Sequence, residues 1–200
     1  MIAAAVAVST GFEVSFQPGS RDGAGRFMGG TEMRVLAAHG GKLFAGNGYW
    51  EDTAGPEGRQ GSQILVLDAP DAGWRVDHDF AERLPDGRHR DLAVSALDEA
   101  RFTTDASGKP LPAPVSLLMA ANWDLAGTAQ VFSRDDATGG WTASTLAQDR
   151  PIPGFLPQVA ALVGIATAPA ASTWSLPGRT PVACLAAPTI RLSPAASAGA

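Results

Sequence analysis

One short loop contains the residues of this chain that are best suited to holding a ligand. It combines two aromatic rings, two carboxylates and an amide: Asn47, Tyr49, Trp50, Glu51 and Asp52. Aromatic rings stack on sugar rings, while carboxylates and amides hydrogen-bond to hydroxyl or backbone groups. We therefore expect a ligand-binding loop for a glycan or a protein, with an exposed polar loop that binds nothing as the alternative.

Other titratable residues give weaker indications of chemistry. His39, His78 and His89 lie at spacings that match no metal-ligand pattern, so neither a metal nor a cofactor is expected. The acidic turns at 68–71 and 135–138 could attract Ca²⁺, but Asp and Gly are also what tight turns require. The charged run 86–91 is expected to be a solvated connection.

A recurring stretch indicates which elements position the loop. Residues 63–76 read QILVLDAPDAGWRV, and residues 130–143 read QVFSRDDATGGWTA. Each copy has a short apolar run, an acidic turn with glycine, and a Trp that opens a second run, which predicts a strand, a hairpin and a strand. The residues that recur at one spacing are Gln63/Gln130, Asp68/Asp135, Gly73/Gly140 and Trp74/Trp141.

Two groups of four strands are predicted around this repeat. In the strand at 74–80, period-two alternation places Trp74, Val76, His78 and Phe80 on one face. A loop is expected at 17–30, and residues 103–114 are expected to be an insertion. The predicted strands lie at 12–16, then at 33–39, 42–46, 63–68 and 74–80, and finally at 90–102, 115–121, 129–134 and 141–147.

A β-hairpin that recurs along a chain is typical of β-propellers. The predicted fold is therefore all-β: a partial propeller with two four-stranded antiparallel blades, at 33–80 and 90–148. Trp74 and Trp141 are expected to fill the wedge between blades. The remaining parts are an apolar segment, strand and loop at 1–32, the start of a third unit at 157–162, and an irregular tail at 159–200.

The two units resemble blades of bacterial kelch-type and sialidase-type β-propellers. Gly46-Asn47-Gly48 and Trp74 are similar to the glycine pair and the Trp of a kelch blade, whereas the second unit has Ala120-Ala121 in place of the glycines. The sialidase-type Asp-box is approached by Ser133, Asp135, Gly139 and Trp141, with altered spacing. The resemblance covers residues 33–148 and implies a propeller fold.

The sialidase resemblance implies one specific alternative, a fragment of a sialidase-like glycoside hydrolase. Tyr49 and Glu51 would then correspond to the nucleophile and its base. Such an enzyme also grips a substrate carboxylate with three arginines, and Arg34, Arg59 and Arg90 lie on separate predicted elements without a motif around them. Catalysis is therefore the second hypothesis.

Composition narrows the partners and the setting. A net charge of −5 argues against non-specific nucleic-acid binding, and no apolar run is long enough to span a bilayer. The single cysteine, Cys184, excludes an internal disulfide framework. The apolar start resembles a signal peptide without its cationic segment, so export to the periplasm or the medium stays open.

The tail at 159–200 is rich in Ala, Pro, Ser and Thr and lacks the rhythm of strands and turns. It is expected to be either disordered or read in a shifted frame. Because a closed propeller needs about four to eight blades, we expect a truncated or partial protein. The leading hypothesis is a non-catalytic binding scaffold. The product of a disrupted gene, without function, is a further alternative.

Overall fold

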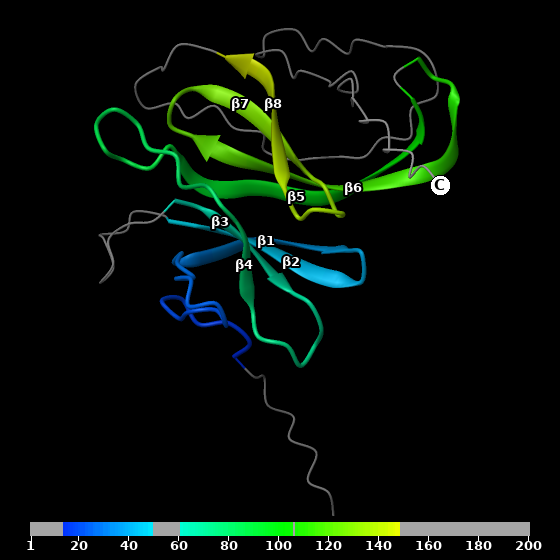
Figure 1. Cartoon of the computed structure of the whole chain (residues 1–200). Coiled ribbons are helices and arrows are strands. Elements are labelled where there is room, and N and C mark those ends of the chain that lie inside the picture. Colours follow the sequence, from blue (N-terminus) through cyan, green and yellow to red (C-terminus); the bar gives the residue numbers. More distant parts are fainter. Residues whose placement is uncertain (1–13, 50–60, 106, 149–200) are drawn as a thin grey trace, which may run out of the picture.

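The computed structural model describes residues 14–49, 61–105 and 107–148. All regular structure in these ranges is antiparallel β-sheet, which confirms the predicted all-β class (Figure 1). They include no helix that could cross a bilayer. The strands are β1 (Glu32–His39), β2 (Lys42–Gly48), β3 (Gln63–Leu67), β4 (Arg75–Asp79), β5 (Asp91–Thr104), β6 (Pro110–Asp124), β7 (Thr128–Arg134) and β8 (Trp141–Gln148).

The strands form two meanders in which each strand pairs with the next along the chain. The first sheet comprises β1 to β4 and the second sheet comprises β5 to β8. A single antiparallel pair, Gly48 with Ala93, joins β2 to β5. The two meanders therefore form one curled antiparallel sheet, and the junction lies at the end of β2, where the candidate ligand loop begins.

Turn residues explain the hairpins. β1 and β2 are joined by Gly40 and Gly41, whose φ angles are 56° and 75°. A two-residue hairpin of type I′ requires positive φ at both central positions, and glycine adopts it without steric cost. His39 consequently pairs directly with Lys42 across the turn.

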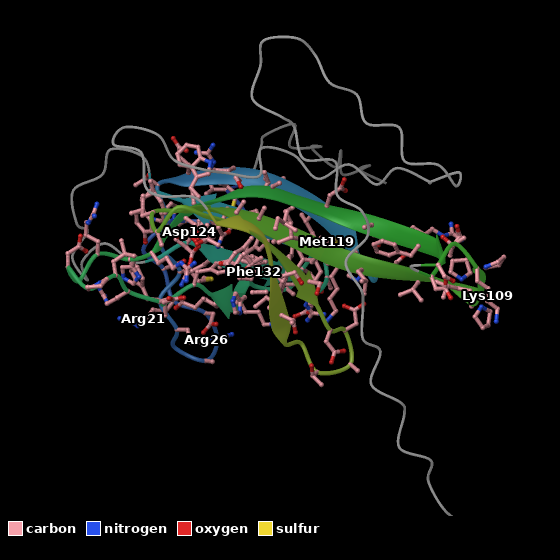
Figure 2. All side chains as sticks on the ribbon, turned by 90° about the horizontal axis from the view of Figure 1, so that it is seen from above. Arg21, Arg26, Lys109, Met119, Asp124 and Phe132 are labelled. Carbon is pink, nitrogen blue, oxygen red and sulfur yellow. The ribbon has the colours of Figure 1, made fainter. Side chains whose placement is uncertain are left out.

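The main core lies between the two sheets. Phe44, Ile64 and Val66 of the first sheet face the second sheet, and the rings of Phe80 and Phe132 meet edge to face at 4.9 Å. Figure 2 shows Phe132 inside this layer. The residues that the second sheet contributes to the same core are Val94, Leu97, Leu118, Ala120, Phe132 and Trp141.

A smaller core covers the other side of the first sheet. Met28 and Phe16, from the segment before β1, pack there with Trp74. From the sheet itself come Ala45, Leu65 and Val76. We call the face of each sheet that carries its recurring Trp, Trp74 or Trp141, the front face, and the opposite face the back face. The front face of the second sheet thus packs on the back face of the first.

A β-bulge at Asp77 overturns one prediction. Ile64 pairs with His78 and Leu65 pairs with Val76, so that Asp77 is an extra residue in β4. The bulge reverses the alternation, because two residues of β4 then face one of β3. Val76 and Trp74 lie on the front face, whereas Phe80 belongs to the core between the sheets. The prediction of one shared face for Trp74, Val76, His78 and Phe80 was therefore wrong.

Two further predictions change in the structure. The insertion expected at 103–114 largely continues the β5–β6 hairpin, which turns at Asp105 to Lys109, and Lys109 lies at its far tip (Figure 2). Residues 14–16, part of a predicted strand, belong to no described ladder. The predicted third unit and tail, at 157–162 and 159–200, lie outside the described residues.

Candidate functional site

Asn47 is the last residue but one of β2, and its side chain is fully buried and hydrogen-bonded. Its Nδ2 donates to the Gly29 carbonyl at 2.9 Å, and its Oδ1 accepts from the Gln63 amide nitrogen at 2.6 Å. The Gln63 side chain in turn accepts from the Gly29 nitrogen at 2.9 Å. Asn47 therefore fixes the base of the candidate loop and points into the protein.

Tyr49 follows Asn47 and is also buried. Its backbone nitrogen donates to the Leu92 carbonyl at 3.2 Å, which ties the loop to β5. Its hydroxyl lies against Gly29, where an added Cβ would come within 1.9 Å of the oxygen. The structure thus brings Asn47 and Tyr49 together beneath the loop, while Trp50, Glu51 and Asp52 lie outside the described residues.

A second group of polar residues lies beside this loop, at the junction of the two sheets, and includes the buried Asp91 and Asp124. Arg90 donates from Nε and Nη2 to the carboxylate of Asp124, at 3.0 and 2.6 Å, and from Nη1 to Glu82 at 2.9 Å. Asp91 lies opposite Asp124 in the β5–β6 ladder, and its carbonyl accepts from the Ser62 nitrogen at 3.0 Å. This junction therefore contains more acidic groups than cations.

Asp91 is the carboxylic acid of this cluster whose pKa is raised by folding. Its side chain is buried, with 4% of the residue exposed, and one carboxylate oxygen has no hydrogen-bond partner among the described residues. Burial raises the pKa of Asp91 to about 6, the neighbouring Asn122 amide opposes that rise, and Asp124 adds to it. The prediction that the run 86–91 is a solvated turn was wrong at its last residue.

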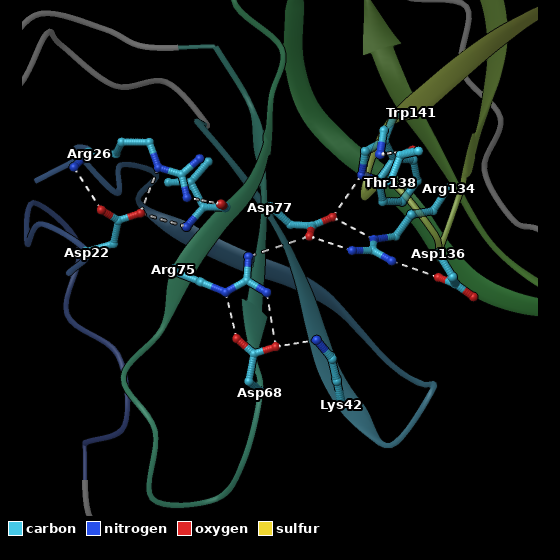
Figure 3. Close-up of polar contacts among 12 residues, drawn as sticks. Asp22, Arg26, Lys42, Asp68, Arg75, Asp77, Arg134, Asp136, Thr138 and Trp141 are labelled. Atoms are coloured by element: carbon cyan, nitrogen blue, oxygen red, sulfur yellow. Dashed lines mark hydrogen bonds and ion pairs between the residues drawn. The ribbon is translucent and has the colours of Figure 1, made fainter. Parts of the chain in front are cut away.

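Asp77 connects the two sheets through charged hydrogen bonds (Figure 3). Its carboxylate accepts from Nε and Nη2 of Arg134, at 2.9 and 3.0 Å, and from Nε1 of Trp141 at 2.9 Å. The side chains of Asp77 and Arg134 are only 3% and 10% exposed. A paired geometry of this kind is strong because both partners are charged and largely desolvated.

His39 forms a second connection between the sheets. Nδ1 contacts the Glu99 carboxylate at 2.7 Å, and Nε2 contacts Asp136 at 2.8 Å. Both ring nitrogens of His39 are thus held by carboxylates of the second sheet and its β7–β8 turn. The hydrogen bond from His39 holds the pKa of Glu99 below its usual value. The sequence pattern showed only that His39 precedes a turn.

The recurring acidic residues, Asp68 and Asp135, accept hydrogen bonds from side chains of their own sheet or turn. Asp68 accepts from Lys42 Nζ at 2.5 Å and Arg75 Nε at 2.6 Å, and these hydrogen bonds, led by that of Arg75, hold its pKa far below the usual value. Asp135 accepts from the Thr138 hydroxyl at 2.8 Å. Within the described ranges, no three His, Cys, Asp or Glu side chains gather as they would around a metal ion.

The recurring glycines differ in their backbone requirement. Among Gly73, Gly139 and Gly140, only Gly139 has a positive φ angle, of 72°. The backbone therefore requires glycine at position 139, whereas the residue that matches Gly73 in the sequence is Gly140.

Trp74 directly precedes β4, and Trp141 is the first residue of β8. Trp74 donates from Nε1 to the Ser15 hydroxyl at 2.9 Å and packs edge to face on Phe16 at 6.5 Å. Trp141 donates to Asp77 and packs on the His78 ring at 5.9 Å. Each indole thus joins its sheet to the element that covers the front face.

The arginines considered for a sialidase site have separate partners. Arg34 lies over the Trp123 ring at 4.3 Å and pairs with Glu32 at 3.2 Å. Arg90 is held by Asp124 and Glu82, as described above, and Arg59 lies outside the described residues. No family model, curated protein or solved structure matches this chain.

Proposed function

We propose that the chain is a non-catalytic binding scaffold built as an arc of a β-propeller, in which each four-stranded sheet is one blade. The observation that carries this proposal is the head-to-tail contact of the sheets. Trp141 lies on the front face of the second sheet and packs on the back face of the first. The contact joins a front face to a back face, and not two like faces. Adding further sheets by the same contact would therefore generate an arc or ring of sheets.

The partners that the charged side chains have within the protein favour a scaffold over an enzyme. Asp77 and Arg134 neutralise each other between the sheets, and Arg90 is occupied by two carboxylates. Tyr49, the residue that the sialidase resemblance would make a nucleophile, is buried beneath Gly29. A sialidase-like fragment therefore remains the second candidate, supported by the resemblance of its sequence motifs.

The ligand is expected at the loop that follows Tyr49. The base of this loop is rigid, since Asn47 and Gln63 hydrogen-bond to each other and to Gly29. Binding loops gain affinity when a rigid scaffold positions them. Trp50 supplies an aromatic ring and Asp52 a carboxylate, which suits a glycan, with a protein segment as the other class of ligand.

The test uses the full chain on an array of sialylated and neutral oligosaccharides. We expect binding that Trp50→Ala abolishes without changing the melting temperature. Asp71→Ala, in the exposed β3–β4 turn, is the matched control and should bind as the unaltered chain does. Absence of binding on the array would reject the glycan class, and cleavage of a fluorogenic sialoside by the chain would replace the scaffold with the enzyme.

A further inference from the structure

The segment before β1 has the same local fold as the connection between β4 and β5. Arg21 bridges to Phe27 in the first segment, and Arg83 bridges to His89 in the second. The separation in sequence from Arg21 to Arg83 equals that from Phe27 to His89, and we call this separation the offset. A bridge of this kind closes a small loop, so residues 21–27 and 83–89 are two copies of one loop.

The side-chain and glycine geometry of the two loops also agrees. Arg21 Nη1 donates to the Gly25 carbonyl at 2.8 Å, and Arg83 Nη1 donates to the Gly87 carbonyl at 2.7 Å. Gly25 and Gly87 have φ angles of 80° and 84°. Matching donors, acceptors and positive φ angles at one offset identify a repeated element rather than two similar turns.

The backbone hydrogen bonds extend the match to both ends of the loop. Asp22 N donates to Arg26 O at 2.9 Å, and Leu84 N donates to Arg88 O at 2.8 Å. The same offset relates two further bonds, both of 2.9 Å: Met28 N to Ser20 O, and Arg90 N to Glu82 O. The loop is thus repeated over its whole length.

The residues that precede each loop correspond as well. Ser15 and Asp77 stand at the same offset, and they accept the indole hydrogen bonds of Trp74 and Trp141. Phe16 and His78 follow them and pack against those same two indoles. Residues 14–16 therefore occupy, over the front face of the first sheet, the place that β4 occupies over the front face of the second.

We propose that residues 14–16 are the outer strand of a further four-stranded sheet, and that the front face of the first sheet docks this sheet. The occupant is a set of three consecutive antiparallel strands of the same repeat type, with the free edge of its third strand beside residues 14–16. This proposal rests on the propeller-like architecture proposed above, and it is independent of the ligand loop.

Exposure of Val14 supports this occupant. Val14 corresponds to Val76, whose side chain lies on the front face of the first sheet. Val76 is 2% exposed, whereas Val14 is 86% exposed. Both side chains precede the residue that accepts the Trp indole hydrogen bond. Val76 pairs with Leu65 of β3 and packs with Ala45 and Leu65 of its own sheet, as well as with Met28 and Phe16 of the segment before β1. Three further strands would supply for Val14 the part of this cover that comes from within the sheet.

The experiment supplies the three strands in the same repeat order. Residues 32–73 of this chain are placed directly before residue 12 of the full chain, because residue 12 corresponds to Trp74 at this offset. Amide exchange at residues 14–16 should slow at least tenfold relative to the chain as it stands. Val14→Asp should lower the urea midpoint of the extended chain and leave that of the unextended chain unchanged.

A second measurement keeps the proposal testable if the extended chain does not fold. A peptide of residues 61–69, which includes β3, is added to the isotope-labelled full chain. We expect shifts in the amide resonances of residues 14–16, and none with a shuffled peptide. Unchanged exchange in a folded extended chain, or no resonance shift with the peptide, would overturn the proposal. A dimer of the full chain that depends on Val14 would overturn it too, because a second copy of the chain would then cover this face.

Discussion

Trp141 and Asp77 meet across the interface of the two sheets, with the indole Nε1 donating to the carboxylate at 2.9 Å. Asp77 reaches this position because a β-bulge turns it toward the second sheet. The same carboxylate accepts both hydrogen bonds of Arg134. One bulged residue thus supplies the principal polar contact between the sheets.

Removing the Asp77 carboxylate should destabilise the protein strongly. Asp77→Ala leaves the Arg134 guanidinium and the Trp141 indole without their shared acceptor in a largely buried interface. Breaking a buried ion pair on one side costs about 3–5 kcal/mol. Urea unfolding monitored by circular dichroism measures this loss.

Trp141→Phe is the matched control for that experiment, since it removes the indole N–H and keeps an aromatic ring. We expect a loss of about 1–2 kcal/mol, from one hydrogen bond and some packing. Equal losses for Asp77→Ala and Trp141→Phe would show that the ion pair with Arg134 contributes little.

Asp91 should lower the stability of the protein at neutral pH. Its folded pKa of about 6 lies above the ordinary value of 3.8, so folding favours the protonated form. The resulting stabilisation is complete below about pH 4 and is lost as the pH rises through 6. Asp91→Asn should therefore add up to about 3 kcal/mol at pH 7 and little at pH 4.

The control for this prediction is Asp124→Asn, which removes the partner of Arg90 and should destabilise the protein at both pH values. The measurement is the free energy of unfolding at pH 4, 5, 6 and 7. If the difference between Asp91→Asn and the unaltered chain does not change with pH, then Asp91 does not titrate in this range.

Gly46 should tolerate no side chain. An added Cβ would lie 2.6 Å from Val94 and 2.7 Å from Val35, both packed in the core between the sheets. Overpacking of this kind typically costs about 1–3 kcal/mol. Gly23→Ala is the control, because nothing lies within 4 Å of its added Cβ. Comparable melting temperatures for the two variants would contradict the packing described.

Asp68 should contribute little despite its two cationic partners. Its side chain and those of Lys42 and Arg75 are each more than a third exposed, and exposed ion pairs contribute about 0–1 kcal/mol. Because its pKa is lowered by folding, that contribution should disappear as the pH falls below about 4. Asp68→Asn, compared with Asp71→Asn by urea unfolding, checks this; a loss above 2 kcal/mol would contradict it.

Local patterns in the sequence were sufficient to predict where β1 to β8 lie, but they also predicted a strand over 14–16 that joins no described ladder and an insertion at 103–114 that is mostly strand. The runs around Phe44 and Leu118, and the Gly40-Gly41 turn, carry β-sheet signals that depend only on neighbouring residues. The bulge at Asp77 could not be predicted, because an extra residue in a ladder is defined by the register with β3. It moved His78 to the opposite face from Val76.

Burial of the junction residues was also hidden from the sequence. Asp91 ends a run of charged residues, and only the pairing of β5 with β6 shows that it faces Asp124 in the interior. Residues 21–27, before β1, form a loop like that at 83–89, and this likeness was missed for a different reason. The structure of the loop at 21–27 depends on Arg21, Gly25 and backbone hydrogen bonds, while most other side chains differ between the copies.

Nuclear Overhauser contacts from the indole rings of Trp74 and Trp141 test the head-to-tail arrangement most directly. The head-to-tail arrangement predicts contacts from Trp141 to His78 and from Trp74 to Phe16 in the full chain, with no contact between Trp141 and Phe16. Contacts from both indoles to the same ring, or none from Trp141 to any residue of the first sheet, would contradict it.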